Sequence, residues 1–163
     1  MEYLNSYIGK EISGYIRLDQ SEKDYSYFHS LGIHLQFIGE NNGILMITDN
    51  RGDEIICSIC SKEKFEEEKL DGYGFLHNPK ADDHLNIIIG KELKAICLGQ
   101  HSTAGLQGNG FTIQRGEIQA IIFEFENKEL LIMNSGDEIW TEADDKIKPE
   151  KLDLRYIHWR EII

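Results

Sequence analysis

Residues 32–47, with the sequence GIHLQFIGENNGILMI, decide the fold class that this chain predicts. In the first half, the apolar residues Ile33, Leu35 and Phe37 alternate with polar ones, as in a half-buried strand. The polar segment Glu40–Gly43 follows, and its Asn and Gly residues tolerate the positive φ angles of tight hairpin turns. A second apolar run ends the stretch. The pattern therefore predicts two antiparallel strands joined by a tight turn.

A second copy of this pattern lies later in the chain. Residues 121–133, IIFEFENKELLIM, again form two apolar runs separated by a polar turn. Each copy is followed by GDEI, beginning at Gly52 and Gly136, and each is preceded by IGKE, with its glycine at Gly9 and Gly90. The IGKE glycines lie 81 residues apart (from 9 to 90) and the GDEI glycines 84 residues apart (from 52 to 136). Chance similarity between hairpins is the alternative, but three matches in the same order favour an internal duplication.

The duplication predicts a mainly β chain with one or two short helices. In this fold, two pseudo-repeated antiparallel β-meanders form a sheet sandwich or a partly closed barrel. A length of 163 residues suits a single domain. The expected limits are residues 1–163 for the domain, approximately 7–60 and 88–142 for the pseudo-repeats, and 151–160 for a C-terminal strand.

Two segments between the predicted strands carry specific expectations. Ser61–Leu70 is rich in helix-forming residues and Ser61 is a suitable N-cap, so we expect a short surface helix. Gly99–Gly110 is rich in Gly, Ser and Gln, and we expect a long mobile loop. Binding loops are drawn from such segments, so a binding role for this loop stays open.

The chain is acidic, with a net charge of −12 and a pI near 4.9. This charge repels phosphates, so we expect no nucleic-acid partner and no membrane binding, whereas a basic protein would be attracted. The N-terminus lacks the features of a signal peptide, and no apolar run approaches the ~20 residues that span a membrane. Three cysteines, an odd number, argue against a disulfide framework. Together these features predict a cytoplasmic protein.

The residue types that carry chemistry form no catalytic pattern. Cys57 and Cys60 have the CxxC spacing of zinc or disulfide-exchange sites, but in a strand they point to opposite faces, so we expect buried structural cysteines. Cys97 and His101 would act as nucleophile and base only in a geometry that the sequence does not fix. Gly99–Gly110 lacks the ending of a phosphate-binding P-loop. We therefore predict no enzyme activity, no catalytic residues, no cofactor and no metal site.

Acidic residues gather in three clusters along the chain. A charge run is usually a solvated face, but clusters on one surface can also steer a basic partner and raise its association rate. The candidate partner-binding residues are Glu66, Glu67, Glu68, Asp82, Asp83, Asp144 and Asp145.

In size, acidity, β-rich pattern and lack of catalytic motifs, the whole chain resembles the immunity proteins of bacterial polymorphic-toxin and contact-dependent growth inhibition systems. This resemblance implies a protein–protein interaction with one cognate, basic toxin domain, often a nuclease. It implies inhibition by occlusion of the toxin's active site, with acidic side chains standing where substrate phosphates would bind.

Two functions of other classes stay open. The first is a small-ligand-binding protein or an enzyme, with a pocket between the repeats lined by His34, His101 and the Gly99–Gly110 loop. The second is an assembly module that forms a homodimer through an exposed strand edge. Fold alone does not choose between these functions and inhibition.

Overall fold

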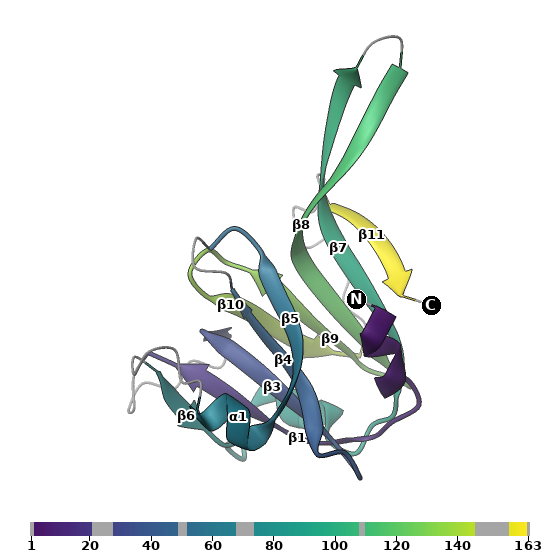
Figure 1. The fold of residues 1–163 in the computed structure, drawn as a ribbon. Helices are drawn as coiled ribbons and strands as arrows, with labels where there is room; N and C mark the ends of the chain where they lie inside the picture. Colours follow the sequence, from purple (N-terminus) through teal and green to yellow (C-terminus); the bar gives the residue numbers. More distant parts are fainter. Residues whose placement is uncertain are drawn as a thin grey trace.

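The computed structural model describes residues 2–20, 28–48, 52–67, 74–107, 110–145 and 157–162. The chain is mainly β, as predicted, and its strands form two antiparallel sheets (Figure 1). Within the described residues the sheets face each other across one core and do not close into a barrel. The sandwich is therefore the form, of the two expected, that the chain adopts.

The first sheet has the strand order β5–β4–β3–β1–β6. Its centre is the predicted hairpin, in which β3 and β4 pair with His34 opposite Leu45. A short helix, α1 (Lys62–Glu67), follows the edge strand β5. The strand bounds are β1 (Ile12–Asp19), β3 (Gly32–Phe37), β4 (Asn42–Thr48), β5 (Ile55–Ser61) and β6 (Phe75–His77).

The second sheet has the strand order β11–β7–β8–β9–β10–β2. Its edge strand β2 comes from the first half of the chain and pairs with β10, so the two halves share this sheet. The strand bounds are β2 (His29–Ser30), β7 (Leu93–Gln107), β8 (Gly110–Phe125), β9 (Glu129–Asn134), β10 (Ile139–Asp144) and β11 (Ile157–Ile162). The predicted C-terminal strand thus begins at Ile157 among the described residues, and residues 151–156 lie outside them.

The main core lies between the two sheets. It takes Tyr15 and Leu35 from the first sheet and Phe123 and Leu130 from the second, all of them buried. Because side chains alternate along a strand, each sheet can give one whole face to this core. Full burial of a Leu, Ile or Phe side chain stabilises a fold by ~1.5–3 kcal/mol, so the interface between the sheets dominates stability.

The two meanders follow the same order, β1–β3–β4–β5 and β7–β8–β9–β10. A 3-10 helix precedes each of them, η1 (Glu2–Tyr7) and η3 (His84–Ile88). The IGKE phrases lie side by side, with Glu11 opposite Glu92. Their backbone bonds are Gly9 N–H to Leu93 O (2.8 Å), Gly90 N–H to Ile12 O (2.9 Å), Leu93 N–H to Lys10 O (2.8 Å) and Ile12 N–H to Lys91 O (2.9 Å). Exchanging the two copies reproduces this set, which is the symmetry that a duplication would leave; the duplication itself stays a prediction.

The two GDEI turns also lie against each other. Gly52 and Gly136 both have positive φ angles, 71° and 83°, which favour glycine. A Cβ atom on Gly52 would lie 2.9 Å from the carbonyl carbon of Gly136, so this approach requires glycine. Thr48 Oγ1 donates to the carbonyl oxygen of Asp137 (3.2 Å) and ties the turns together.

Two predicted connecting segments have different outcomes. The Lys64 N–H donates to Ser61 Oγ (3.2 Å), so Ser61 is the N-cap that the sequence predicted for α1. The expected loop at Gly99–Gly110 is wrong, because β7 continues to Gln107 and pairs with β8. Within the described residues, the part beyond His101 is a two-stranded ribbon that projects from the sandwich (Figure 1).

No helix among the described residues is long and apolar enough to cross a membrane.

Candidate functional site

The predicted acidic residues lie on several different elements. Glu66 is exposed on α1, and Asp82 is exposed in the turn before η3. Asp144 and Asp145 are exposed at the end of β10, on the other sheet. Glu67 is the last residue of α1 and nothing further of its side chain is described, while Glu68 lies outside the described residues.

The prediction for Asp83 is wrong. Its side chain is fully buried and receives two hydrogen bonds from Arg17, Nε to Oδ2 (2.9 Å) and Nη2 to Oδ1 (3.1 Å). Asp83 Oδ1 also accepts the Leu85 N–H (2.9 Å) and caps η3. The carboxylate is therefore a structural group of the interior and is not available to a partner.

Arg17 connects the two sheets at this point. It lies on β1 of the first sheet, and its Nη1 donates to Ser30 Oγ (3.0 Å) of the second. Oγ1 of Thr141, on β10, lies 3.4 Å from Arg17 Nη1 and 3.4 Å from His84 Nε2. Burial lowers the pKa of His84, and the neighbouring Arg17 lowers it further. This polar cluster joins the two sheets and fixes how they lie against each other.

A different set of acidic residues does come together, on the outer face of the second sheet. Glu124 on β8 pairs with Glu129 on β9, which pairs with Asp144 on β10. Directly paired residues share a face, and Phe123 and Leu130 next to them point into the core. The three carboxylates therefore form a row on the outside of the sheet.

The turn between β8 and β9 extends this row. Glu126 is exposed there, and Asp145 contacts Lys128, which neutralises part of the charge. The turn and the adjoining strand ends surround a hollow of about 530 Å³. We call Glu124, Glu126, Glu129, Asp144 and Asp145 the acidic ridge.

Sequence reasoning found two members of the acidic ridge and missed three. Asp144 and Asp145 are adjacent acids in the sequence, whereas Glu124, Glu126 and Glu129 are single acids without an acidic neighbour. The alternation Glu124-Phe125-Glu126 was the available signal, because it places two acids on the face opposite a core residue. The row depends on the register in which β8 pairs with β9 and β9 with β10, and local sequence does not determine that register.

The cysteines occupy structural positions. Cys57 and Cys60 are buried on opposite faces of β5, as the strand spacing predicted, with Cys57 in the main core and Cys60 under Phe65 of α1. Burial raises the pKa of the Cys57 thiol to about 12. Cys97 Sγ donates to Glu124 Oε1 (3.4 Å), and nothing is described of the His101 side chain. No described residues form a group of His, Cys, Asp and Glu that could hold a metal ion.

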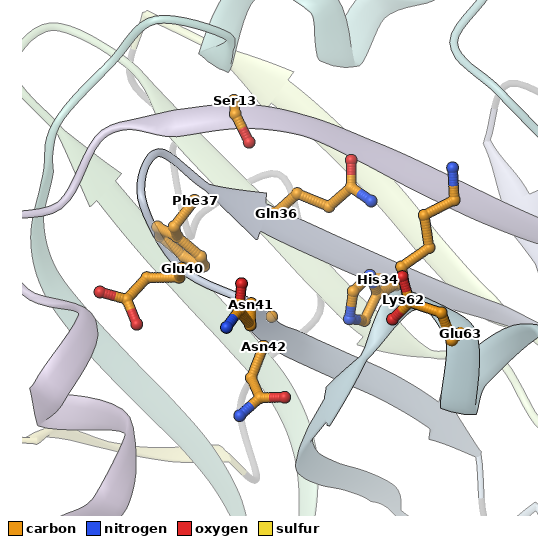
Figure 2. Close-up of a pocket in the computed structure, with 10 residues that line it drawn as sticks. Ser13, His34, Gln36, Phe37, Glu40, Asn41, Asn42, Lys62 and Glu63 are labelled. Carbon is orange, nitrogen blue, oxygen red and sulfur yellow. The ribbon is translucent and has the colours of Figure 1, made fainter.

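A polar pocket of about 380 Å³ lies on the outer face of the first sheet. Ser13 of β1, His34 and Gln36 of β3, Asn42 of β4 and Glu63 of α1 line it (Figure 2). His34 therefore does not face the space between the repeats, where the sequence predicted it would line a pocket. His34 instead pairs with Ile16 and Leu45, which belong to the cluster under α1.

His34 is the buried floor of this pocket, 1% exposed. Its ring stacks on Phe65, with centroids 5.5 Å apart, and its Nε2 lies 3.0 Å from the Cys60 carbonyl oxygen. Because a carbonyl only accepts, Nε2 carries the proton. Burial lowers the pKa of His34, which keeps the ring neutral at neutral pH. Nδ1 is then an acceptor, and it is buried without a hydrogen-bond partner among the described residues.

Comparison of the chain with protein-family models, curated protein sequences and solved structures gives no match.

Proposed function

We propose that the chain is a protein-binding inhibitor of the immunity-protein kind, which neutralises a cognate bacterial toxin domain by occluding its active site. The observation that carries the proposal is the acidic ridge, where Glu124, Glu129 and Asp144 stand side by side across three strands. A sheet holds these side chains at fixed spacing, so they can meet a basic surface with little loss of conformational freedom.

The negative charge of the acidic ridge would attract a basic surface. Like charges directly opposite each other on a sheet are destabilising. A basic partner that places positive charge against Glu124, Glu129 and Asp144 would be attracted to this row. A nuclease presents basic side chains where it binds phosphates, and carboxylates can occupy the same positions. The net charge of −12 would also speed the encounter with such a partner.

The test compares three charge-reversal variants as bait in a pull-down from lysate of the source cell. The ridge variant carries Glu126→Lys, Asp144→Lys and Asp145→Lys, all at exposed positions. The matched control carries Glu2→Lys, Glu92→Lys and Glu117→Lys, which are also exposed and change the net charge equally. A third variant, Glu66→Lys with Asp82→Lys, tests the remaining predicted clusters.

The expected result is one stoichiometric, basic partner that is released by salt and retained by the matched control. With the purified partner, the ridge variant should associate about tenfold or more slowly at low salt, since steering raises association rates by about 10- to 1,000-fold. Equal rates and equal salt dependence for the ridge variant and wild type would overturn the assignment of the ridge. Absence of any partner at either salt would overturn the inhibitor itself.

The projecting ribbon favours a second candidate, a homodimeric assembly module. An isolated two-stranded ribbon is marginally stable in water, so a ribbon that extends from the sandwich gains from contact with a second chain. Light scattering over a range of protein concentrations tests this candidate. A mass that rises to twice that of one chain supports it, and a constant single-chain mass contradicts it.

A further inference from the structure

The pocket around His34 contains a buried nitrogen, His34 Nδ1, that has no hydrogen-bond partner among the described residues. Nδ1 of His34 must accept a hydrogen bond, because Nε2 donates to the Cys60 carbonyl and the ring is neutral. Leaving such an acceptor unpaired in the interior is destabilising. Gly43 allows this arrangement, because a Cβ atom there would lie 2.8 Å from the ring. A group that donates a hydrogen bond into the pocket would recover this cost.

Most charged side chains around the pocket belong to ion pairs, and Glu63 adds one further negative charge. Lys10 pairs with Glu40 (2.6 Å) and Lys62 with Glu66 (3.7 Å). The Glu63 carboxylate accepts hydrogen bonds from its own backbone N–H and from Ser61, which lower its pKa. Glu63 would repel an anion, and the lysines at the pocket already have carboxylate partners, so we infer a neutral ligand.

Several other lining side chains both donate and accept hydrogen bonds. Ser13 supplies a hydroxyl, and Gln36 and Asn42 supply amides, from three neighbouring strands (Figure 2). Hydroxyl groups on a ligand match this set, because each donates once and accepts as well. The volume of about 380 Å³ lies near the lower end of the range for ligand sites, roughly 300–1,000 Å³.

We propose that this pocket binds a small neutral molecule rich in hydroxyl groups, with the size and chemistry of a monosaccharide. One hydroxyl donates to His34 Nδ1, and others bond to Ser13, Gln36 and Asn42. Since Nδ1 is buried, the hydroxyl reaches it when a flexible side chain of the wall, Gln36 or Lys62, rotates aside; such rotamer changes are common on binding. The site lies on the first sheet and is independent of the acidic ridge.

The test follows the histidine ring nitrogens by NMR in ¹⁵N-labelled protein. Glucose, galactose, N-acetylglucosamine and ribose are added separately at millimolar concentrations, with ethanolamine and acetate as charged probes. The expected result is that at least one sugar shifts the unprotonated Nδ1 resonance of His34 and leaves Nε2 protonated. Ser13→Ala and Asn42→Ala should each weaken that binding about fivefold, as loss of one hydrogen bond of ~1 kcal/mol implies.

Control variants separate a loss of binding from a loss of folding. Ser13 and Asn42 are exposed, so both variants leave the fold intact, and Ser135→Ala, exposed in a turn of the other half, should change nothing. The proposal is overturned if no sugar shifts the His34 Nδ1 resonance. It is also overturned if Ser13→Ala and Asn42→Ala bind the sugar as tightly as wild type does. A shift produced by ethanolamine or acetate alone would likewise overturn the neutral ligand class.

Discussion

At the scale of single residues, the buried pair of Arg17 and Asp83 gives the sharpest prediction of stability. Asp83→Asn keeps a side chain of the same shape but removes the carboxylate charge that pairs directly with the buried guanidinium. Breaking a buried ion pair from one side costs about 3–5 kcal/mol, so the free energy of unfolding in urea should fall by that amount. The control is the exposed neighbour Asp82→Asn, expected within about 0.5 kcal/mol of wild type. Equal effects of the two substitutions would contradict the burial of Asp83.

Two buried histidines predict how stability depends on pH. Burial lowers the pKa of both His34 and His84 in the folded chain below the ordinary value of 6.5. The unfolded chain therefore binds more protons, and stability is present in full above about pH 6.5 and is lost as the pH falls below it. His34→Gln and His84→Gln should each reduce this loss, by up to about 1.4 kcal/mol per pH unit. Urea unfolding at a series of pH values measures it, and an unchanged pH dependence in both variants would contradict the prediction.

At the scale of elements, the features predicted correctly are those that neighbouring residues in the sequence determine. The Asn- and Gly-containing turn gave the β3–β4 hairpin, and the Ser61 hydroxyl gave the start of α1. The segment at Gly99–Gly110 was misjudged because its composition is typical of loops, whereas its residues pair with those of the next strand, β8, in a long hairpin. Asp83 was misjudged for a different reason, since its partner Arg17 is far away in the chain.

The ribbon formed by the ends of β7 and β8 is predicted to be separable from the sandwich. Thr103 pairs directly with Gln114, so residues 104–113 can be replaced by an Asn-Gly turn without breaking the register. The shortened protein should unfold in urea with a free energy within about 1 kcal/mol of wild type, because the main core is untouched. A loss of cooperative unfolding would show that the ribbon belongs to the folding unit.

At the scale of the whole molecule, the two halves are predicted to fold only together. Each sheet offers one apolar face to the common core, and a half on its own would expose that face to water. Two further features cross between the halves: β2 pairs with β10, and Arg17 pairs with Asp83. The internal symmetry therefore does not imply that either half is an independent domain.

Cutting the chain between Asn78 and Pro79 tests this dependence, because the cut lies after β6 and before η3. Fragments 1–78 and 79–163 should each lack a cooperative unfolding transition and a dispersed NMR spectrum. Mixed in equal amounts, they should recover both, since the sheet interface supplies most of the buried apolar surface. Asp83→Asn in the second fragment should weaken this association, because it breaks the buried ion pair with Arg17 that joins the two fragments. A fragment that folds cooperatively by itself would show that one meander is a complete domain, and the symmetry would then describe two joined units.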